Sequence, residues 1–117
     1  MTEIRVLRGE DYDMEPLDGI PGEFVLRDAF GEPEGAPVCL GMWEVRESDE
    51  PTVFDYTQEC VLQYVLEGSV EAEMNGVVYE AKAGDFLFIP QGPDTEVKWR
   101  PTSGRYRAIY VTHPYWH

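Results

Sequence analysis

The stretch that decides the fold is 63–99, QYVLEGSVEAEMNGVVYEAKAGDFLFIPQGPDTEVKW. Apolar runs of strand length alternate in it with the turn sequences EG, NG, AGD and PQG. The NG pair at 75–76 is the clearest turn, because both residues readily adopt the positive φ angles of a tight type I′ hairpin. Before it, the run 70–74 alternates apolar side chains with glutamates, which predicts a strand with one dry face. The stretch is therefore typical of an antiparallel sheet.

The rest of the chain repeats this pattern, and helical periodicity is hard to find. The expected strands are 4–7, 24–28, 38–45, 52–56, 61–66, 70–74, 77–81, 86–89, 95–99 and 106–112. Exposed loops are expected at 31–37, GEPEGAP, and 47–51, ESDEP, where Gly, Pro and charged residues gather. We predict an all-β antiparallel sandwich or barrel in one domain, 1–117, with its core at 52–112 and residues 1–36 wrapping the barrel or exchanging with a partner subunit.

The acidic composition of the chain excludes two classes of binding partner. Asp and Glu outnumber Lys and Arg by 23 to 9, and the net charge is −14. This charge repels nucleic-acid phosphates and anionic membrane surfaces, so we expect neither partner. The sequence has no signal-peptide pattern and no apolar run of membrane-spanning length, which predicts a cytoplasmic protein.

The two cysteines, Cys39 and Cys60, are expected to be reduced. They lack CxxC spacing, and a lone pair in a reducing compartment is more often two small buried hydrophobes than a disulfide. No neighbouring His or basic residue in the sequence would lower the pKa of either thiol, so neither is a convincing nucleophile.

Four framework residues carry a resemblance to a known superfamily. Gly68, Gly84, Pro90 and Gly92 stand at the spacing of the glycines and proline in the two motifs of the cupin superfamily. This resemblance implies a single small antiparallel jelly-roll barrel. Three segments, FDYTQE with YVLEG, AKAGDFLFIPQG and the final YVTHPYW, are also similar to the ethanolamine utilisation protein Q family. That similarity implies a small cupin domain, and an acyl-phosphate-forming role has been proposed for such relatives.

Cupins commonly hold a divalent metal through histidines and one carboxylate. By this resemblance, the position of the carboxylate ligand is occupied by Val61 and that of the last histidine by Thr95. The other two histidine positions correspond to either 54 and 56 or 55 and 57. None of these positions carries a strong ligand, so we expect no metal and no cofactor. The histidines that are present, His113 and His117, stand at the end of the chain without ligand spacing.

An oxygen-rich site with rearranged ligands remains an alternative. It would require Glu59, Gln63 and Asp94 to converge. We expect Glu59 to be a solvent-exposed carboxylate at a strand end.

The interior is expected to form a pocket. Strand alternation places Val61, Gln63 and Val65 on one inward face, and 95, 97 and 99 on another. The candidate lining residues for a small-molecule ligand are Tyr56, Gln63, Thr95, Trp99 and Arg107. Arg107 contributes only if its strand register turns it inward; otherwise it is an outward ion-pair partner. No catalytic residue can be assigned.

Three functional hypotheses follow, and they leave open whether the protein is an enzyme. The first is a metal-free cupin that binds a small organic metabolite in the barrel. The second is an enzyme, either a metal-dependent lyase, isomerase or dioxygenase or an acyl-phosphate-forming enzyme. The third is a non-catalytic dimeric module. A homodimer is expected in any case, because pairing can cover the open sheet edges of a small jelly roll.

Overall fold

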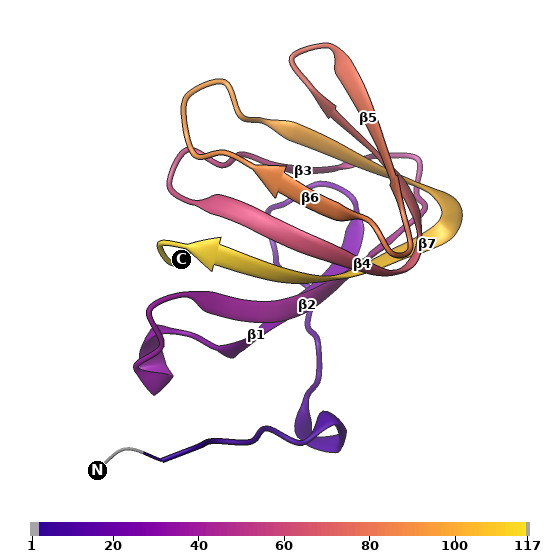
Figure 1. Ribbon diagram of the computed structural model, residues 1–117. Helices are drawn as coiled ribbons and strands as arrows, with labels where there is room; N and C mark the ends of the chain where they lie inside the picture. The colour runs from indigo at the N-terminus through magenta and orange to yellow at the C-terminus, as the bar shows by residue number, and fades with distance from the viewer. Residues whose placement is uncertain (1–2, 117) are drawn as a thin grey trace.

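The computed structural model describes residues 3–116 and is built almost wholly from antiparallel strands (Figure 1). The strands are β1 (Glu23–Phe30), β2 (Cys39–Arg46), β3 (Thr52–Phe54), β4 (Cys60–Met74), β5 (Val77–Lys82), β6 (Phe86–Ile89) and β7 (Val97–His113). Two short 3-10 turns, η1 (Gly9–Asp11) and η2 (Glu32–Glu34), are the described helical elements. The all-β prediction is confirmed.

Two long strands, β4 and β7, organise the whole sheet (Figure 1). One half of each strand, 60–68 in β4 and 106–113 in β7, belongs to a layer in which the strands are ordered β1-β2-β7-β4-β6. Their other halves, 70–74 and 97–101, belong to a layer ordered β3-β7-β4-β5. Because the same two strands pass through both layers, the interior is one continuous space.

A bulge at Gly68 lets β4 pass from one layer to the other. Gly68 has φ of 79°, and a Cβ there would lie 2.0 Å from the carbonyl oxygen of Arg105. The register with β7 shifts on both sides of this position. Only glycine fits the conformation and the close approach together.

The bulge explains an error in the expected strands. We predicted a break near Gly68 and another between 99 and 106, but each pair of strands is a single long one. The ladder between β4 and β7 continues past both glycine-containing segments, and this pairing is invisible to local sequence patterns. The expected strand at 4–7 is absent, and η2 interrupts the loop expected to be irregular at 31–37.

The turns predicted from local sequence are present. Asn75 and Gly76 have φ of 53° and 79°, and they join Met74 to its partner Val77. This is the expected hairpin. Gly84 also has a positive φ, and β6 ends directly before the proline at 90.

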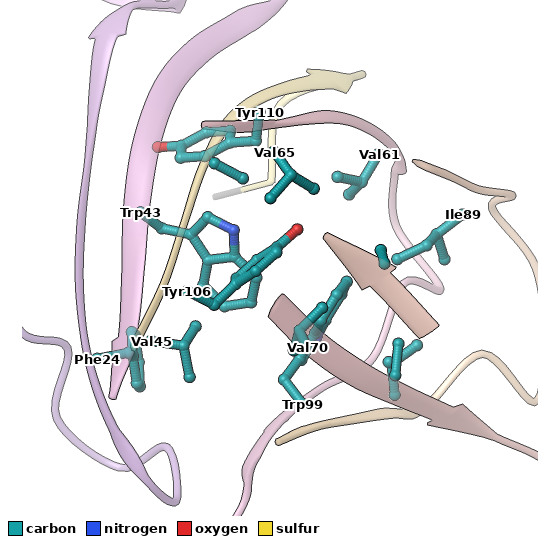
Figure 2. Close-up of a cluster of buried hydrophobic side chains, with 14 of the residues drawn as sticks. Phe24, Trp43, Val45, Val61, Val65, Val70, Ile89, Trp99, Tyr106 and Tyr110 are labelled. Atoms are coloured by element: carbon teal, nitrogen blue, oxygen red, sulfur yellow. The ribbon is translucent and has the colours of Figure 1, made fainter. Parts of the chain in front are cut away.

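An aromatic cluster fills the barrel beside the bulge (Figure 2). Trp43 packs edge-to-face on Trp99, with ring centroids 5.0 Å apart, and on Tyr106, at 6.0 Å. Trp99 and Tyr106 are fully buried. Each such ring pair contributes about 0.5–1.5 kcal/mol beyond the burial of its area.

The segment before β1 is attached to the outer strands through Tyr12 and Glu15. The Tyr12 hydroxyl accepts a hydrogen bond from the Met42 amide at 2.9 Å and contacts the Arg27 carbonyl. Glu15 forms a backbone bridge with Leu26. These contacts hold the chain beside β1 and β2.

The cysteines are free thiols in the structure. Cys39 is buried, as expected, whereas Cys60 at the start of β4 is only half-buried. Cys60 is adjacent to the inward-facing Val61 on the strand, so its own side chain points outward. The expectation that Cys60 belongs to the core was wrong. No helix among the described residues is long and apolar enough to cross a membrane.

Candidate functional site

A cavity of about 330 Å³ lies in the part of the barrel next to the C-terminal end of β7. Its walls come from β1, β2, β3, β4 and β7, together with the loop 55–59 and the C-terminal Trp116. Trp43 belongs to the aromatic cluster and also lines the cavity, so it forms the floor where the two meet. The cavity is larger than a few water molecules require and has the size and mixed lining of a small-molecule site.

Gln63 is fixed at the base of this cavity. Its side-chain oxygen accepts hydrogen bonds from Trp43 Nε1 at 3.2 Å and from the Tyr106 hydroxyl at 2.6 Å. An indole N–H can only donate, so the amide oxygen must be the atom that faces Trp43. The amide nitrogen of Gln63 is thereby left as a donor for the cavity.

Tyr56 places a phenol on the opposite wall. Its hydroxyl accepts a hydrogen bond from Trp99 Nε1 at 3.2 Å, and its backbone N–H donates to Thr95 Oγ1 at 3.2 Å. Burial raises the pKa of Tyr56 far above its ordinary value. The phenol therefore keeps its proton and remains a donor at physiological pH.

Glu59 is the ionisable group of the cavity interior. Its side chain is 6% exposed, and among residues 3–116 no hydrogen-bond donor or cation contacts its carboxylate. Burial, reinforced by the negative charge of Asp55, raises the pKa of Glu59 to about 7. The carboxyl group therefore changes charge near neutral pH.

The expectation that Glu59 would be exposed was wrong. The loop before β4 already follows the alternation of the strand, so Glu59, Val61 and Gln63 all face the cavity. Extending the alternation of inward-facing residues two positions back from Val61 would have predicted that Glu59 faces the cavity.

The structure brings together only some of the predicted lining residues. Tyr56 and Gln63 both line the cavity. Thr95 and Trp99 point inward but lie outside its lining: Trp99 is fully buried in the aromatic cluster, and Thr95 Oγ1 donates to the Gly92 carbonyl at 2.8 Å. Asp94 is exposed outside the cavity, so it does not converge with Glu59 and Gln63.

Arg107 lies on the outer face of the sheet. Its guanidinium pairs with Glu44 Oε1 at 3.2 Å, and Arg46 and Arg105 contact the same carboxylate. Burial acts to raise the pKa of Glu44, but the hydrogen bond and charge of Arg46, with the two other arginines, outweigh it and lower that pKa. Alternation along β7 turns Tyr106 and Ala108 inward and Arg107 outward, where this ion-pair cluster holds its guanidinium.

The positions that would hold a cupin metal do not supply a fitting donor set. Val61 offers only carbon atoms, and the Thr95 hydroxyl is already engaged with backbone groups. Within residues 3–116 no three or more His, Cys, Asp or Glu side chains are grouped so that they could hold a metal ion. His113 is exposed at the end of β7, and His117 lies outside the described residues. We therefore derive no chemical step through a metal.

The sequence reasoning missed the wall formed by the C-terminal segment. The Tyr110 hydroxyl and Trp116 Nε1 both donate to Asp28 Oδ1, at 2.6 and 2.8 Å. Gly41 makes room for this arrangement, since a Cβ there would lie 2.5 Å from the Tyr110 hydroxyl oxygen. The segment YVTHPYW carried the family resemblance, and this contact gives a physical reason for two of its aromatic residues.

Comparison with known proteins identifies the family. The sequence model described as "Ethanolamine utilisation protein EutQ" matches residues 1–117. The protein named acetate kinase EutQ of Salmonella typhimurium is 30% identical over 112 residues, which cover 95% of this chain but only 46% of that relative. The chain thus spans about half the length of this relative.

Solved structures agree on the fold. A crystal structure of an ethanolamine utilisation protein Q from Salmonella typhimurium LT2 matches with a TM-score of 0.79 and 25% identity, covering 95% of this chain and 86% of the other. An RmlC-like cupin from Shewanella frigidimarina NCIMB 400 shares the fold, with a TM-score of 0.68 and 17% identity over 94% of this chain and 90% of its own. The expected cupin jelly roll is confirmed, and the chain belongs to the ethanolamine utilisation protein EutQ family.

Proposed function

We propose that this protein binds a small organic molecule inside the barrel, in the cavity floored by Trp43. The observation that carries the proposal is a 330 Å³ cavity with aromatic walls and a few polar side chains, Tyr56, Glu59, Gln63 and Thr112, in its lining. Ligand sites commonly combine apolar walls with a few fixed polar groups. A cytoplasmic location is part of the proposal, since both cysteines are free thiols, as expected in a reducing compartment.

The polar groups suit a molecule with oxygen or nitrogen functions. Gln63 presents an amide N–H, Tyr56 a phenol, and Glu59 a carboxyl group. Thr112 adds a buried hydroxyl to which no N–H group of the described residues donates. These four groups would orient a ligand whose apolar part lies against the rings.

The activity for which the relative is named, acetate kinase, receives no support from this cavity. Binding a transferable phosphoryl group generally requires arginine, lysine or a metal to compensate its charge. The described lining contains no lysine or arginine, and its charged groups are the carboxylates of Asp55 and Glu59. We therefore favour ligand binding over phosphoryl transfer at this site.

The proposal is tested by ligand-observed NMR with a library of small polar metabolites. Val61→Trp fills the cavity, and Val78→Trp on the exposed face of β5 is the matched control. We expect binders of the wild type to bind Val78→Trp equally and Val61→Trp at least about tenfold more weakly. If Val61→Trp does not fold, Thr112→Phe fills the same space. Equal binding by the folded filling variant, or no binder of the wild type, would contradict the proposal.

We also propose that the protein is a homodimer through the outer face of the larger layer. Two rows of apolar side chains cross four strands there: Leu40, Val111, Leu62 and Phe88 in one row, and Met42, Ile109, Tyr64 and Phe86 in the next. Phe86 and Phe88 are 80% and 64% exposed. A contiguous apolar face of this kind marks an interaction site.

Charge favours a second copy as the occupant of this face. Each chain carries a net charge of −14, so two copies can approach closely only through a surface without carboxylates. The two apolar rows contain no charged residue, and the ionic row of Glu44 and Arg107 borders them. A two-fold axis would place this single patch against itself.

Sedimentation equilibrium at micromolar concentration tests the dimer. We expect twice the chain mass of 13.4 kDa for the wild type. Leu62→Glu should produce a monomer, because it introduces like charges at the contact. Val78→Glu, at a side chain with the same 48% exposure on β5, should remain dimeric. A monomeric wild type, or a dimeric Leu62→Glu, would overturn the proposal.

A further inference from the structure

We infer that the ligand of the cavity is a protonated amine with an apolar body, and that its ammonium group is bound by Glu59. The inference rests on the proposed function and names the chemical class of its ligand. It depends on the sign of the charge in the cavity, on the shape of the walls and on a buried hydroxyl acceptor.

The charge in the cavity has one sign. The titratable groups of its described lining are Asp55, Tyr56, Glu59 and Tyr110, and Asp28 lies behind Tyr110. Both tyrosines have pKa values raised by burial and stay neutral. An ionised Glu59 is therefore a buried charge without a counter-charge, which is costly unless a ligand supplies the cation.

The walls suit an ammonium group as well as its apolar body. The rings of Trp43, Tyr56, Tyr110 and Trp116 line the space around Glu59. Aromatic faces attract cations through their quadrupole, most strongly where water is excluded. A carboxylate or phosphate ligand would instead meet two protein carboxylates and the negative faces of these rings.

A second, independent feature supports an amine. The Thr112 hydroxyl is 3% exposed, lines the cavity and lies beside the Cys39 thiol, toward which it can donate; no N–H group of the described residues donates to its oxygen. Its oxygen is an acceptor available to an N–H group. An ammonium group has three donors, so it can satisfy the Glu59 carboxylate and also a hydroxyl acceptor.

The pH dependence of binding follows from Glu59. Its pKa of about 7 means that the carboxyl is mostly protonated at pH 6 and mostly ionised at pH 8. Asp55, at the exposed mouth, is the other carboxylate of the lining. Amine binding should therefore strengthen as the pH rises from 6 to 8, because only the ionised Glu59 attracts the cation.

Calorimetric titration with three probes of nearly the same shape tests the inference: 2-phenylethylamine, 2-phenylethanol and phenylacetate. At pH 8 we expect the amine to bind the wild type at least about tenfold more tightly than the alcohol, and the carboxylate to bind most weakly. Glu59→Gln should remove the preference for the amine and keep the binding of the alcohol. Glu50→Gln, at an exposed acidic residue outside the lining, is the matched control and should bind as the wild type does.

The outcomes separate this inference from the proposed function. If the alcohol or the carboxylate binds in the cavity as tightly as the amine, the inference fails and the proposed binding function stands. If none of the three probes, and no member of the metabolite library, binds the wild type, both fail. Unchanged amine affinity in folded Glu59→Gln, or affinity that does not rise between pH 6 and pH 8, would also overturn the inference.

Discussion

The barrel has a filled half and a hollow half, and both are built on the same two strands. In the filled half, β4 and β7 contribute Val70, Val97 and Trp99, each at most 2% exposed. In the hollow half, the same strands contribute Val61 and Thr112 to the wall of a 330 Å³ cavity. The backbone is continuous through both halves, so the difference lies in side-chain volume. A second pocket, of about 610 Å³, borders Ala72, Met74 and Val97, so the filled half is packed at its aromatic cluster and open beyond it.

The two halves also differ in how their polar groups are satisfied. In the filled half, the indole of Trp99 donates to Tyr56. In the hollow half, Glu59 and Thr112 are buried, and no N–H group of the described chain donates to the Thr112 hydroxyl. Unpaired buried polar groups lower stability. We expect this difference if the filled half serves folding and the hollow half serves the proposed binding.

Removing the largest side chain of the filled half should have the largest effect. Trp99→Ala leaves a void in the aromatic cluster and the Tyr56 hydroxyl without its donor. We expect a loss of about 3–5 kcal/mol in the free energy of unfolding, measured by urea denaturation. The control Trp116→Phe removes an indole from the hollow half, and a comparable loss in that variant would contradict the division into two halves.

Gln63→Leu tests the group that joins the halves. The substitution removes the acceptor of both Trp43 Nε1 and the Tyr106 hydroxyl. Two buried donors without partners should cost about 2–4 kcal/mol in the same measurement. A loss below about 1 kcal/mol would show that water from the cavity can replace the amide oxygen.

Glu59→Gln should stabilise the protein, but only where the wild-type carboxyl is ionised. Its pKa rises on folding from about 4.5 to about 7, so the wild type loses stability as the pH rises through this range. The variant escapes this loss. The shift corresponds to about 3 kcal/mol at pH 8, and solvent screening reduces it, so we expect the variant to be more stable by about 2 kcal/mol there and equal to the wild type near pH 4.5, in thermal unfolding followed across pH. A difference independent of pH would contradict the burial of an ionisable group here.

The smallest effect is expected at Thr112. Thr112→Val puts a methyl group of the same shape in place of a buried hydroxyl to which no N–H group of the described chain donates. The variant should be unchanged or more stable by up to about 1 kcal/mol, because no hydrogen bond from an N–H group is lost. A loss of stability would reveal a partner for the hydroxyl and weaken its role as a ligand acceptor.

Features encoded by neighbouring residues could be predicted from the sequence. The turn at 75–76 and the glycine at 84 depend on backbone preferences of one or two residues, and both are present. Alternation also correctly predicted Gln63 and Trp99 as inward-facing. The turns and the inward-facing positions of the cupin fold can therefore be predicted from short stretches of sequence.

The site depends on relations that no short segment contains. Arg107 faces outward because the register of β7 buries Tyr106 and Ala108, and its partner there, Glu44, lies on a neighbouring strand. The cavity exists because side chains from five strands leave a common space, and its closing wall requires Asp28 to meet residues more than 80 positions later. Sequence patterns predicted which side chains face inward, but they could not predict which of them fill the barrel and which leave it hollow.

The passage of β4 and β7 through both layers has a consequence for opening of the barrel. Neither layer can detach without breaking the ladder that extends from Cys60 to Met74. Native-state hydrogen exchange should therefore find the amides shared by these strands protected up to the global unfolding free energy. If the proposed ligand binds, we expect it to enter beside the loop 55–59, where residues 55, 57 and 58 are exposed, while the two layers stay together.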